Sequence, residues 1–171
     1  MILAILGGVF LILCAFAAVH DIHRLTIPNW LNLTLVALFV PAVFVSGLPM
    51  EMIGGHALAA GVAFLAAFGL FAFNIFGGGD AKMIPAVMLW IGPSAAIEFI
   101  AAMAIAGGLC AFLVLIVRKT MPVEVLPGSV RAPFEKDGGV PYGVAIAIGV
   151  FAAGGSSPFL TGVLSQISVF G

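Results

Sequence analysis

The stretch Phe76-Gly77-Gly78-Gly79-Asp80-Ala81-Lys82 decides how this chain is organised. A run of about twenty apolar residues, the length that crosses a bilayer, stops here at three consecutive glycines. A carboxylate and an ammonium group follow directly. An acid beside a membrane segment is costly unless it is paired, protonated or wetted, which makes Asp80 a candidate functional residue. Asp21 ends the first apolar run in the same way, and we expect the two carboxyls to meet in space.

Composition indicates an all-α polytopic membrane bundle. Of the 171 residues, 63% are hydrophobic and 8% are charged, and the mean hydropathy is +1.30. In soluble domains, charged residues make up about a quarter of the chain. We therefore predict one integral membrane domain over residues 1–171. The net charge of −1 and the lack of a long basic run exclude nucleic acid as a partner.

The two cysteines, Cys14 and Cys110, lie far apart in apolar runs and form no Cys-x-x-Cys pair. They indicate small packing residues rather than a disulfide or zinc site. We expect no metal and no cofactor.

About six apolar segments are predicted to cross the bilayer: 2–19, 31–45, 57–75, 81–91, 95–117 and 140–153. The first lacks the positive residues that precede the core of a signal peptide, so we interpret it as a retained helix. A polar stretch at about 118–139 is predicted to form a loop. Residues 159–170 are too few to span unaided, and we interpret them as re-entrant or interfacial.

The positive charges predict the orientation. All of them follow the first, third or fifth segment: Arg24, Lys82, Arg118, Lys119, Arg131 and Lys136. The positive-inside rule makes that side cytoplasmic and puts the N-terminus outside. Asp21 and Asp80 then lie at one depth on the cytoplasmic side. His56 lies on the opposite side, which excludes a site that joins it to His20 and His23.

Two carboxyls placed together cannot both ionise cheaply, so the pKa of one is raised and the pair shares a proton. One carboxylate can then take a proton from water while its protonated partner donates to a carbonyl or a leaving amine. This is the chemistry of aspartic peptidases, and it needs no metal. Which acid holds the proton stays open at this stage.

Simpler interpretations exist for both acids. Asp21 could pair with Arg24, three residues further on. The glycines could form a plain turn with Asp80 capping the next helix. Against this, Gly77 and Gly79 can adopt backbone conformations closed to other residues and allow a second chain to approach.

Four further residues are candidates for shaping the site. Pro28 suits the first turn of a helix, and Asn29 offers hydrogen bonds beside it. Lys82 could offset the charge of the acids, contact a substrate, or extend to the headgroups. Tyr142 could donate a hydrogen bond from the last span, although aromatic residues are common at interfaces.

These residues resemble a known family. Asp21, five intervening residues and Ile27-Pro28-Asn29-Trp30-Leu31 resemble the first signature of the type IV prepilin peptidases. Gly77-Gly78-Gly79-Asp80-Ala81-Lys82 is similar to their second signature, Gly-x-Gly-Asp-x-Lys. The later stretch Val140-Pro141-Tyr142-Gly143-Val144-Ala145-Ile146-Ala147 resembles the short members that serve tight-adherence (Flp) pili.

The resemblance implies an aspartic endopeptidase of the bacterial inner membrane whose catalytic acids are Asp21 and Asp80. It implies cleavage of type IV or Flp prepilins, and of pseudopilins, after a glycine at the cytoplasmic face. The pilus assembly machinery would be a further partner. The chain lacks the Cys-x-x-Cys insert of the larger bifunctional relatives and any motif for S-adenosylmethionine, so we expect no N-methylation.

Other functions remain open from the residues alone. Within the class, these are a presenilin-like Gly-x-Gly-Asp protease, which the position of the acids at the membrane rim disfavours, and a preflagellin peptidase. Two alternatives belong to other classes of protein. One is a proton-coupled transporter, although the sequence shows neither inverted repeats nor broken midplane helices. The other is a non-enzymatic assembly factor. An assembly factor would tolerate loss of either acid.

Overall fold

The computed structural model describes residues 1–136 and 138–168, with only the backbone at 164 and 166–168. The described residues contain no strand. Their helices are α1 (Ile2–Arg24), α2 (Asn29–Ser46), α3 (Met50–Ala72), α4 (Gly78–Ile91), α5 (Ala96–Thr120), α6 (Tyr142–Ala153) and α7 (Pro158–Ser168). Short 3-10 turns follow α4 (Pro93–Ala95) and α5 (Val123–Val125, Gly128–Val130 and Ala132–Phe134). The all-α membrane bundle predicted from composition is confirmed.

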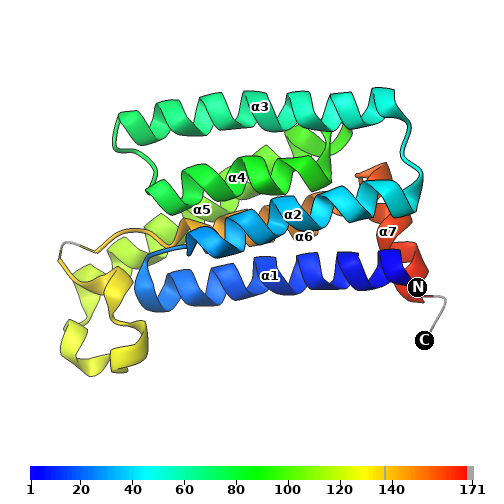
Figure 1. Ribbon diagram of the computed structural model, residues 1–171. Coiled ribbons are helices and arrows are strands. Elements are labelled where there is room, and N and C mark those ends of the chain that lie inside the picture. The colour runs from blue at the N-terminus through cyan, green and yellow to red at the C-terminus, as the bar shows by residue number, and fades with distance from the viewer. Residues whose placement is uncertain (137, 169–171) are drawn as a thin grey trace.

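Within the described part of the chain, four helical segments are long and apolar enough to cross a membrane: Ile2–Arg24, Asn29–Ser46, Met50–Ala72 and Pro93–Thr120. α4 has 14 residues and α6 has 12, and both lie alongside the long helices. From α1 to α6, consecutive helices run in opposite directions (Figure 1). This alternation matches the up-and-down path that the charge pattern predicts.

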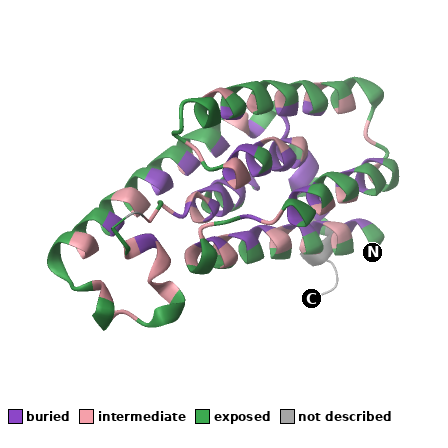
Figure 2. Ribbon diagram, turned by 60° about the vertical axis from the view of Figure 1, so that its left-hand side comes forward, coloured by how far each residue is buried: buried purple, intermediate pink, exposed green. Residues whose placement is uncertain are grey.

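The short helix α4 occupies the middle of the bundle, packed against α3, α2 and α6, and is the most continuously buried helix (Figure 2). Trp90 near its end is fully buried. The indole stacks on Phe10 of α1 with ring centroids 4.4 Å apart, and its N–H donates to the carbonyl of Leu35 in α2 over 2.9 Å. Since a buried indole N–H needs an acceptor, this contact fixes α4 against α1 and α2.

The corner between α4 and α5 closes the end of the bundle remote from the two acids. Gly92 ends α4 with a φ of 72°, and a Cβ there would lie 2.5 Å from Cε1 of His56. The buried His56 shares a hydrogen bond of 2.6 Å between Nδ1 and the carbonyl of Leu89. His56 therefore packs at the end opposite Asp21 and Asp80, as the predicted topology requires.

Several predicted boundaries differ from the structure. The third helix begins at Met50, directly after Pro49, and ends at Ala72, whereas the apolar run had suggested 57–75. A turn with Asn74 at a φ of 58° follows before the glycines, because a left-handed residue cannot continue the helix. α7 has 11 residues and packs against α1 and α4. Residues 169–170 of that predicted segment lie outside the described residues.

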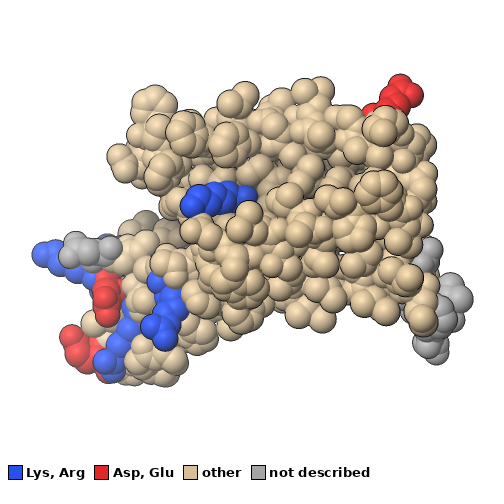
Figure 3. All heavy atoms as spheres, viewed as in Figure 1, with Lys and Arg blue, Asp and Glu red and all other residues tan. Residues whose placement is uncertain are grey.

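The positive charges gather at one end of the bundle, where α1 and α5 end and α4 begins (Figure 3). Glu51 and Glu98 lie in the first turns of α3 and α5, which start at the other end. The gathering of Lys and Arg predicted from the sequence is therefore present in space.

The loop after α5 is held by arginines rather than being an open connector. α5 itself continues to Thr120, so Arg118 belongs to the helix. The Arg118 guanidinium donates to the carbonyls of Pro133 and Gly138 at 2.6 Å each. Arg131 donates to the carbonyl of Leu126 at 2.7 Å. Residue 137 of the predicted loop lies outside the described residues.

Candidate active site

The structure brings Asp21 and Asp80 to one small cavity. Asp21 lies in the last turn of α1 and Asp80 in the first turn of α4. Their exposed fractions are 4% and 8%. Both line a cavity of about 180 Å³ that is completed by the connector between α1 and α2 and by the glycines before Asp80. Two acids 59 positions apart in sequence thus share one pocket.

The end of α1 determines where Asp21 lies. α1 stops at Leu25, whose left-handed backbone (φ 51°) lets its N–H donate to the carbonyl of Asp21 over 2.8 Å. A left-handed residue at this position is a common way to end a helix. The chain then turns through residues 25–28 into α2 and lines the cavity on the way. Asp21 consequently faces the bundle, while Arg24 is exposed.

Gly143 holds the carboxyl of Asp21 from α6. The backbone N–H of Gly143 donates to Oδ2 of Asp21 over 2.7 Å. A Cβ at position 143 would lie 2.9 Å from Cβ of Asp21, so only glycine allows this approach. The bond satisfies one of the N–H groups that lack a partner in the first turn of a helix. Sequence reasoning missed Gly143. The available signal was a glycine at the start of the last long apolar run.

Asp80 is the third residue of α4, and Gly77 occupies the cap position before that helix. The interpretation of Asp80 as a helix cap is therefore wrong. Its position in the first turn still suits a carboxylate, since the N-terminus of a helix carries partial positive charge.

Asp80 lies ahead of the apolar part of α4 and outside the four long spans. Burial, and secondly the nearby charge of Asp21, raise the pKa of Asp80 to about 7, against a smaller opposing effect of a hydrogen bond with the backbone of Gly77. Asp80 therefore holds a proton in a large fraction of molecules at neutral pH.

The glycines before Asp80 matter for space rather than for unusual backbone angles. Gly77 has a φ of −69°, and the positive φ angles of described glycines occur at Gly47 and Gly92. The predicted use of Gly77 and Gly79 for special conformations is therefore wrong. A Cβ on Gly79 would lie 3.0 Å from the backbone nitrogen of Ile27, and a Cβ on Gly77 would lie 2.9 Å from Oδ2 of Asp80. Both glycines permit a close approach inside the cavity.

Lys82, Asn29 and Pro28 are not among the residues that line the cavity of the two acids. The ammonium group of Lys82 donates to Oδ1 of Asn29 over 2.8 Å, which joins α4 to α2. Pro28 stands one residue before α2 rather than within its first turn. Lys82 and Asn29 line a different hollow on the far side of α4.

Tyr142 begins α6, and its half-buried ring packs edge-on against Phe76, with ring centroids 5.0 Å apart. A Cβ on Gly107 of α5 would lie 2.9 Å from Cε1 of this ring. Tyr142 therefore positions the start of α6, whose next residue, Gly143, contacts Asp21.

The histidines near the site bond to backbone. Nδ1 of His20 lies 2.7 Å from the carbonyl of Thr26, and Nδ1 of His23 bonds to the carbonyl of Ser129. Among the described residues, no group of three or more His, Cys, Asp or Glu is placed to hold a metal ion. The polar side chains among the residues that line the cavity are the two carboxyls and Thr26.

Two buried carboxyls that share a cavity at one end of a helical bundle define a paired-acid membrane protein. The family model described as "Type IV leader peptidase family" matches residues 8–112, and the chain belongs to this family. It is accordingly a leader-peptidase-like membrane protease. The matched region includes Asp21 and Asp80 but ends before Gly143. Searches of curated proteins and of solved structures gave no match.

Proposed function

We propose that this protein is an aspartic endopeptidase whose catalytic dyad is Asp21 and Asp80. Its substrates are type IV or Flp prepilins, including pseudopilins, whose leaders it removes at the cytoplasmic face of the inner membrane. The observation that carries this proposal is the shared cavity of the two buried acids in a chain of the type IV leader peptidase family.

We assign different roles to the two acids from their surroundings. Asp21 accepts the N–H of Gly143 over 2.7 Å, whereas the hydrogen bond of Asp80 with the backbone of Gly77 is outweighed by burial and by the charge of Asp21, so we take Asp21 as the proton acceptor. Asp80, with its pKa raised to about 7, is the proton donor. Such a division between an ionised and a protonated carboxyl is the arrangement that a proton-sharing pair requires.

The hydrolysis then proceeds in two balanced steps. Asp21 takes a proton from water as the water oxygen bonds to the scissile carbonyl carbon, and Asp80 gives its proton to the carbonyl oxygen. In the second step the C–N bond breaks, Asp21 returns its proton to the leaving nitrogen, and a hydroxyl of the intermediate returns a proton to Asp80. The pair regains its starting state, and each transfer uses a positioned acid or base.

Charge supports the cytoplasmic side. Lys and Arg gather at the end of the bundle that holds the acids, and this end faces the cytoplasm under the positive-inside rule. The short connector at residues 25–28 between α1 and α2 has no room for a Cys-x-x-Cys insert, which favours peptidase activity without N-methylation. Methyl transfer by the purified protein would contradict this part.

The test is co-expression with a short pilin precursor that carries a basic leader and a glycine before its apolar segment. Asp21→Asn and Asp80→Asn should each lower cleavage at least about a hundredfold, since positioned acid–base groups contribute that much or more. Glu51→Gln at the other end of the bundle is the matched control and should cleave normally. All three variants should accumulate in the membrane. Cleavage at the normal rate by either aspartate variant would end the dyad proposal.

A further inference from the structure

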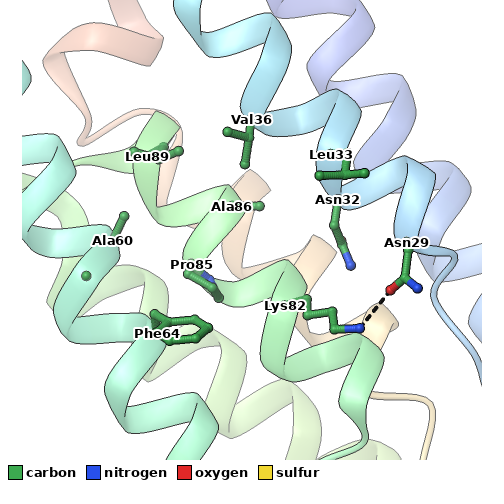
Figure 4. Close-up of a pocket in the computed structure, with 11 residues that line it drawn as sticks. Asn29, Asn32, Leu33, Val36, Ala60, Phe64, Lys82, Pro85, Ala86 and Leu89 are labelled. Carbon is green, nitrogen blue, oxygen red and sulfur yellow. Dashed lines mark hydrogen bonds between the residues drawn. The ribbon is translucent and has the colours of Figure 1, made fainter.

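The face of α4 turned away from the acids forms the floor of a groove. Lys82, Pro85, Ala86 and Leu89 line it at helical spacing. The groove has a volume of about 640 Å³ and lies between α2 and α3 (Figure 4). Both of these helices pack on α4, but they make almost no contact with each other. A channel therefore runs along α4 between two separated walls.

The two walls are apolar and partly open. Leu33 and Val36 line the groove from α2, with exposed fractions of 70% and 41%. Ala60, Gly61 and Phe64 line it from α3. Ala60 and Gly61 are small, and small residues allow helix backbones to approach closely in a membrane. The groove therefore has the shape and chemistry that suit an apolar helix.

One polar side chain in the groove has no partner. Asn32 projects from α2 toward α4 (Figure 4) and is only 6% exposed. Neither its side-chain nitrogen nor its side-chain oxygen makes a hydrogen bond to any described residue. A buried amide left unpaired destabilises a fold. A ligand with both a donor and an acceptor would satisfy Asn32, and a peptide group offers both.

We propose that this groove receives the apolar helix of the prepilin substrate and that Asn32 pairs with peptide groups of its first turn. The inference rests on the proposed function. The first turn of any helix has N–H groups without partners, so Oδ1 of Asn32 is a suitable acceptor. A lipid acyl chain could fill the apolar part but could not pair with the amide.

The groove ends close to the acids. Lys82 and Asn29, joined by their hydrogen bond of 2.8 Å, line its end nearest Asp80, which lies only two residues before Lys82. A substrate helix in the groove would direct the preceding, extended leader past this bond toward the shared cavity. Lys82 and Asn29 thus stand between the docking groove and the dyad.

Filling the groove provides the main test. Gly61 in α3 is exposed and has space for a side chain, with no atom within 4 Å of an added Cβ. Gly61→Leu should raise the KM for a full-length precursor at least about tenfold. Gly54→Leu is the matched control, because Gly54 is also an exposed glycine of α3 with open space but does not line the groove. It should behave like wild type.

A second variant tests the amide. Asn32→Leu should raise the KM for the full-length precursor about fivefold, consistent with the loss of one hydrogen bond. It should leave the melting temperature unchanged or higher, because it removes an unpaired buried amide. A purely structural Asn32 would instead give a lower melting temperature with an unchanged KM, which would overturn its assigned role.

A shortened substrate separates the two proposals. A soluble peptide with the leader and the cleavage site, but without the apolar segment, should be cut equally by wild type, Gly61→Leu and Asn32→Leu. If wild-type protein cuts neither substrate, the proposed function fails. If Gly61→Leu cuts the full-length precursor as well as Gly54→Leu does, the groove proposal alone fails. Loss of a co-purifying phospholipid from Gly61→Leu with normal cleavage would likewise overturn it in favour of a lipid site.

Discussion

Each of the two acids is met by the backbone of a glycine. The N–H of Gly143 bonds to Asp21, and a hydrogen bond with the backbone of Gly77 acts on Asp80. In both places a Cβ would meet the acid at 2.9 Å. Backbone groups hold a carboxyl in place without neutralising it, whereas a lysine or arginine would keep both acids ionised. This environment leaves a proton available for exchange within the pair.

The ionisation of Asp80 predicts a pH dependence. Its pKa is raised by burial and by Asp21 to about 7, so the side chain is mostly protonated below that pH and mostly ionised above it. A proton donor is therefore present at low pH and lost as the pH rises. We expect kcat/KM for a prepilin to fall about tenfold for each pH unit well above 7. Stopped assays of purified protein between pH 6 and 9 would measure this, with melting temperatures at each pH as the control. A rate that rises steadily across this range would contradict the assignment.

Among the elements, α4 carries out three tasks. Its first turn presents Asp80 to the shared cavity, its opposite face forms the floor of the groove, and Trp90 near its end anchors it to α1 and α2. A helix of 14 residues is about 21 Å long, well short of the bilayer core. The long helices around it provide the burial that holds it in place.

The approach of α4 to the connector before α2 predicts a contrast between neighbouring glycines. A Cβ on Gly79 would lie 3.0 Å from both the backbone nitrogen and Cβ of Ile27, whereas a Cβ on Gly78 would meet only the ring of Phe71 at 3.4 Å. Gly79→Ala should therefore push Asp80 away from Asp21. We expect cleavage to fall about tenfold and stability by about 1 to 2 kcal/mol, as for other overpacked sites.

Gly78→Ala is the matched control for that variant and should stay within about twofold of wild type in cleavage. Cleavage assays of both variants in membranes, with thermal unfolding of the purified proteins, would make the comparison. Equal cleavage by the two variants would show that this approach does not position the dyad.

In the whole molecule, the positive charges and the two paired acids lie at the same end of the bundle. Lys and Arg gather at the end that holds Asp21 and Asp80, with acidic residues of the loop after α5 beside them (Figure 3). Glu51 and Glu98 lie in the first turns of α3 and α5, which start at the other end. His56, Gly92 and the start of α7 close that far end by packing. The bundle therefore has one end that holds its Lys and Arg together with Asp21 and Asp80, and a far end without Lys or Arg among the described residues.

This difference between the two ends predicts which end can be labelled from outside the cell. Met50, 81% exposed at the far end, and Val125, 66% exposed in the loop after α5, provide two positions for single cysteines after Cys14 and Cys110 are replaced by alanine. A membrane-impermeant maleimide added to intact spheroplasts should label Met50→Cys and not Val125→Cys. Lysed spheroplasts, in which both should react, are the control. The reverse pattern would place the acids outside and remove the proposed substrate from reach.

The sequence by itself determined the class of fold and singled out Asp21 and Asp80 as candidate functional residues. A chain of this length with a mean hydropathy of +1.30 cannot bury its apolar residues as a soluble domain. An Asp at the end of an apolar run stands out because its burial is costly. Because all Lys and Arg follow the first, third or fifth apolar segment, the sequence also predicted that they gather at one end of the bundle. The catalytic roles of Asp21 and Asp80 stay predictions.

Only the tertiary structure decided what surrounds those acids. The bond from Gly143 to Asp21 joins two helices, and the approach of Gly79 to Ile27 joins a helix to the connector before α2. The unpaired state of Asn32 likewise depends on how α2 packs against its neighbours. Local sequence patterns report the period and the ends of a helix, but not which face packs against which neighbour. In a uniformly apolar chain almost every face is apolar, so the pattern contains little information about packing. The shape of the groove and the backbone partners of the dyad follow from how the helices fit together.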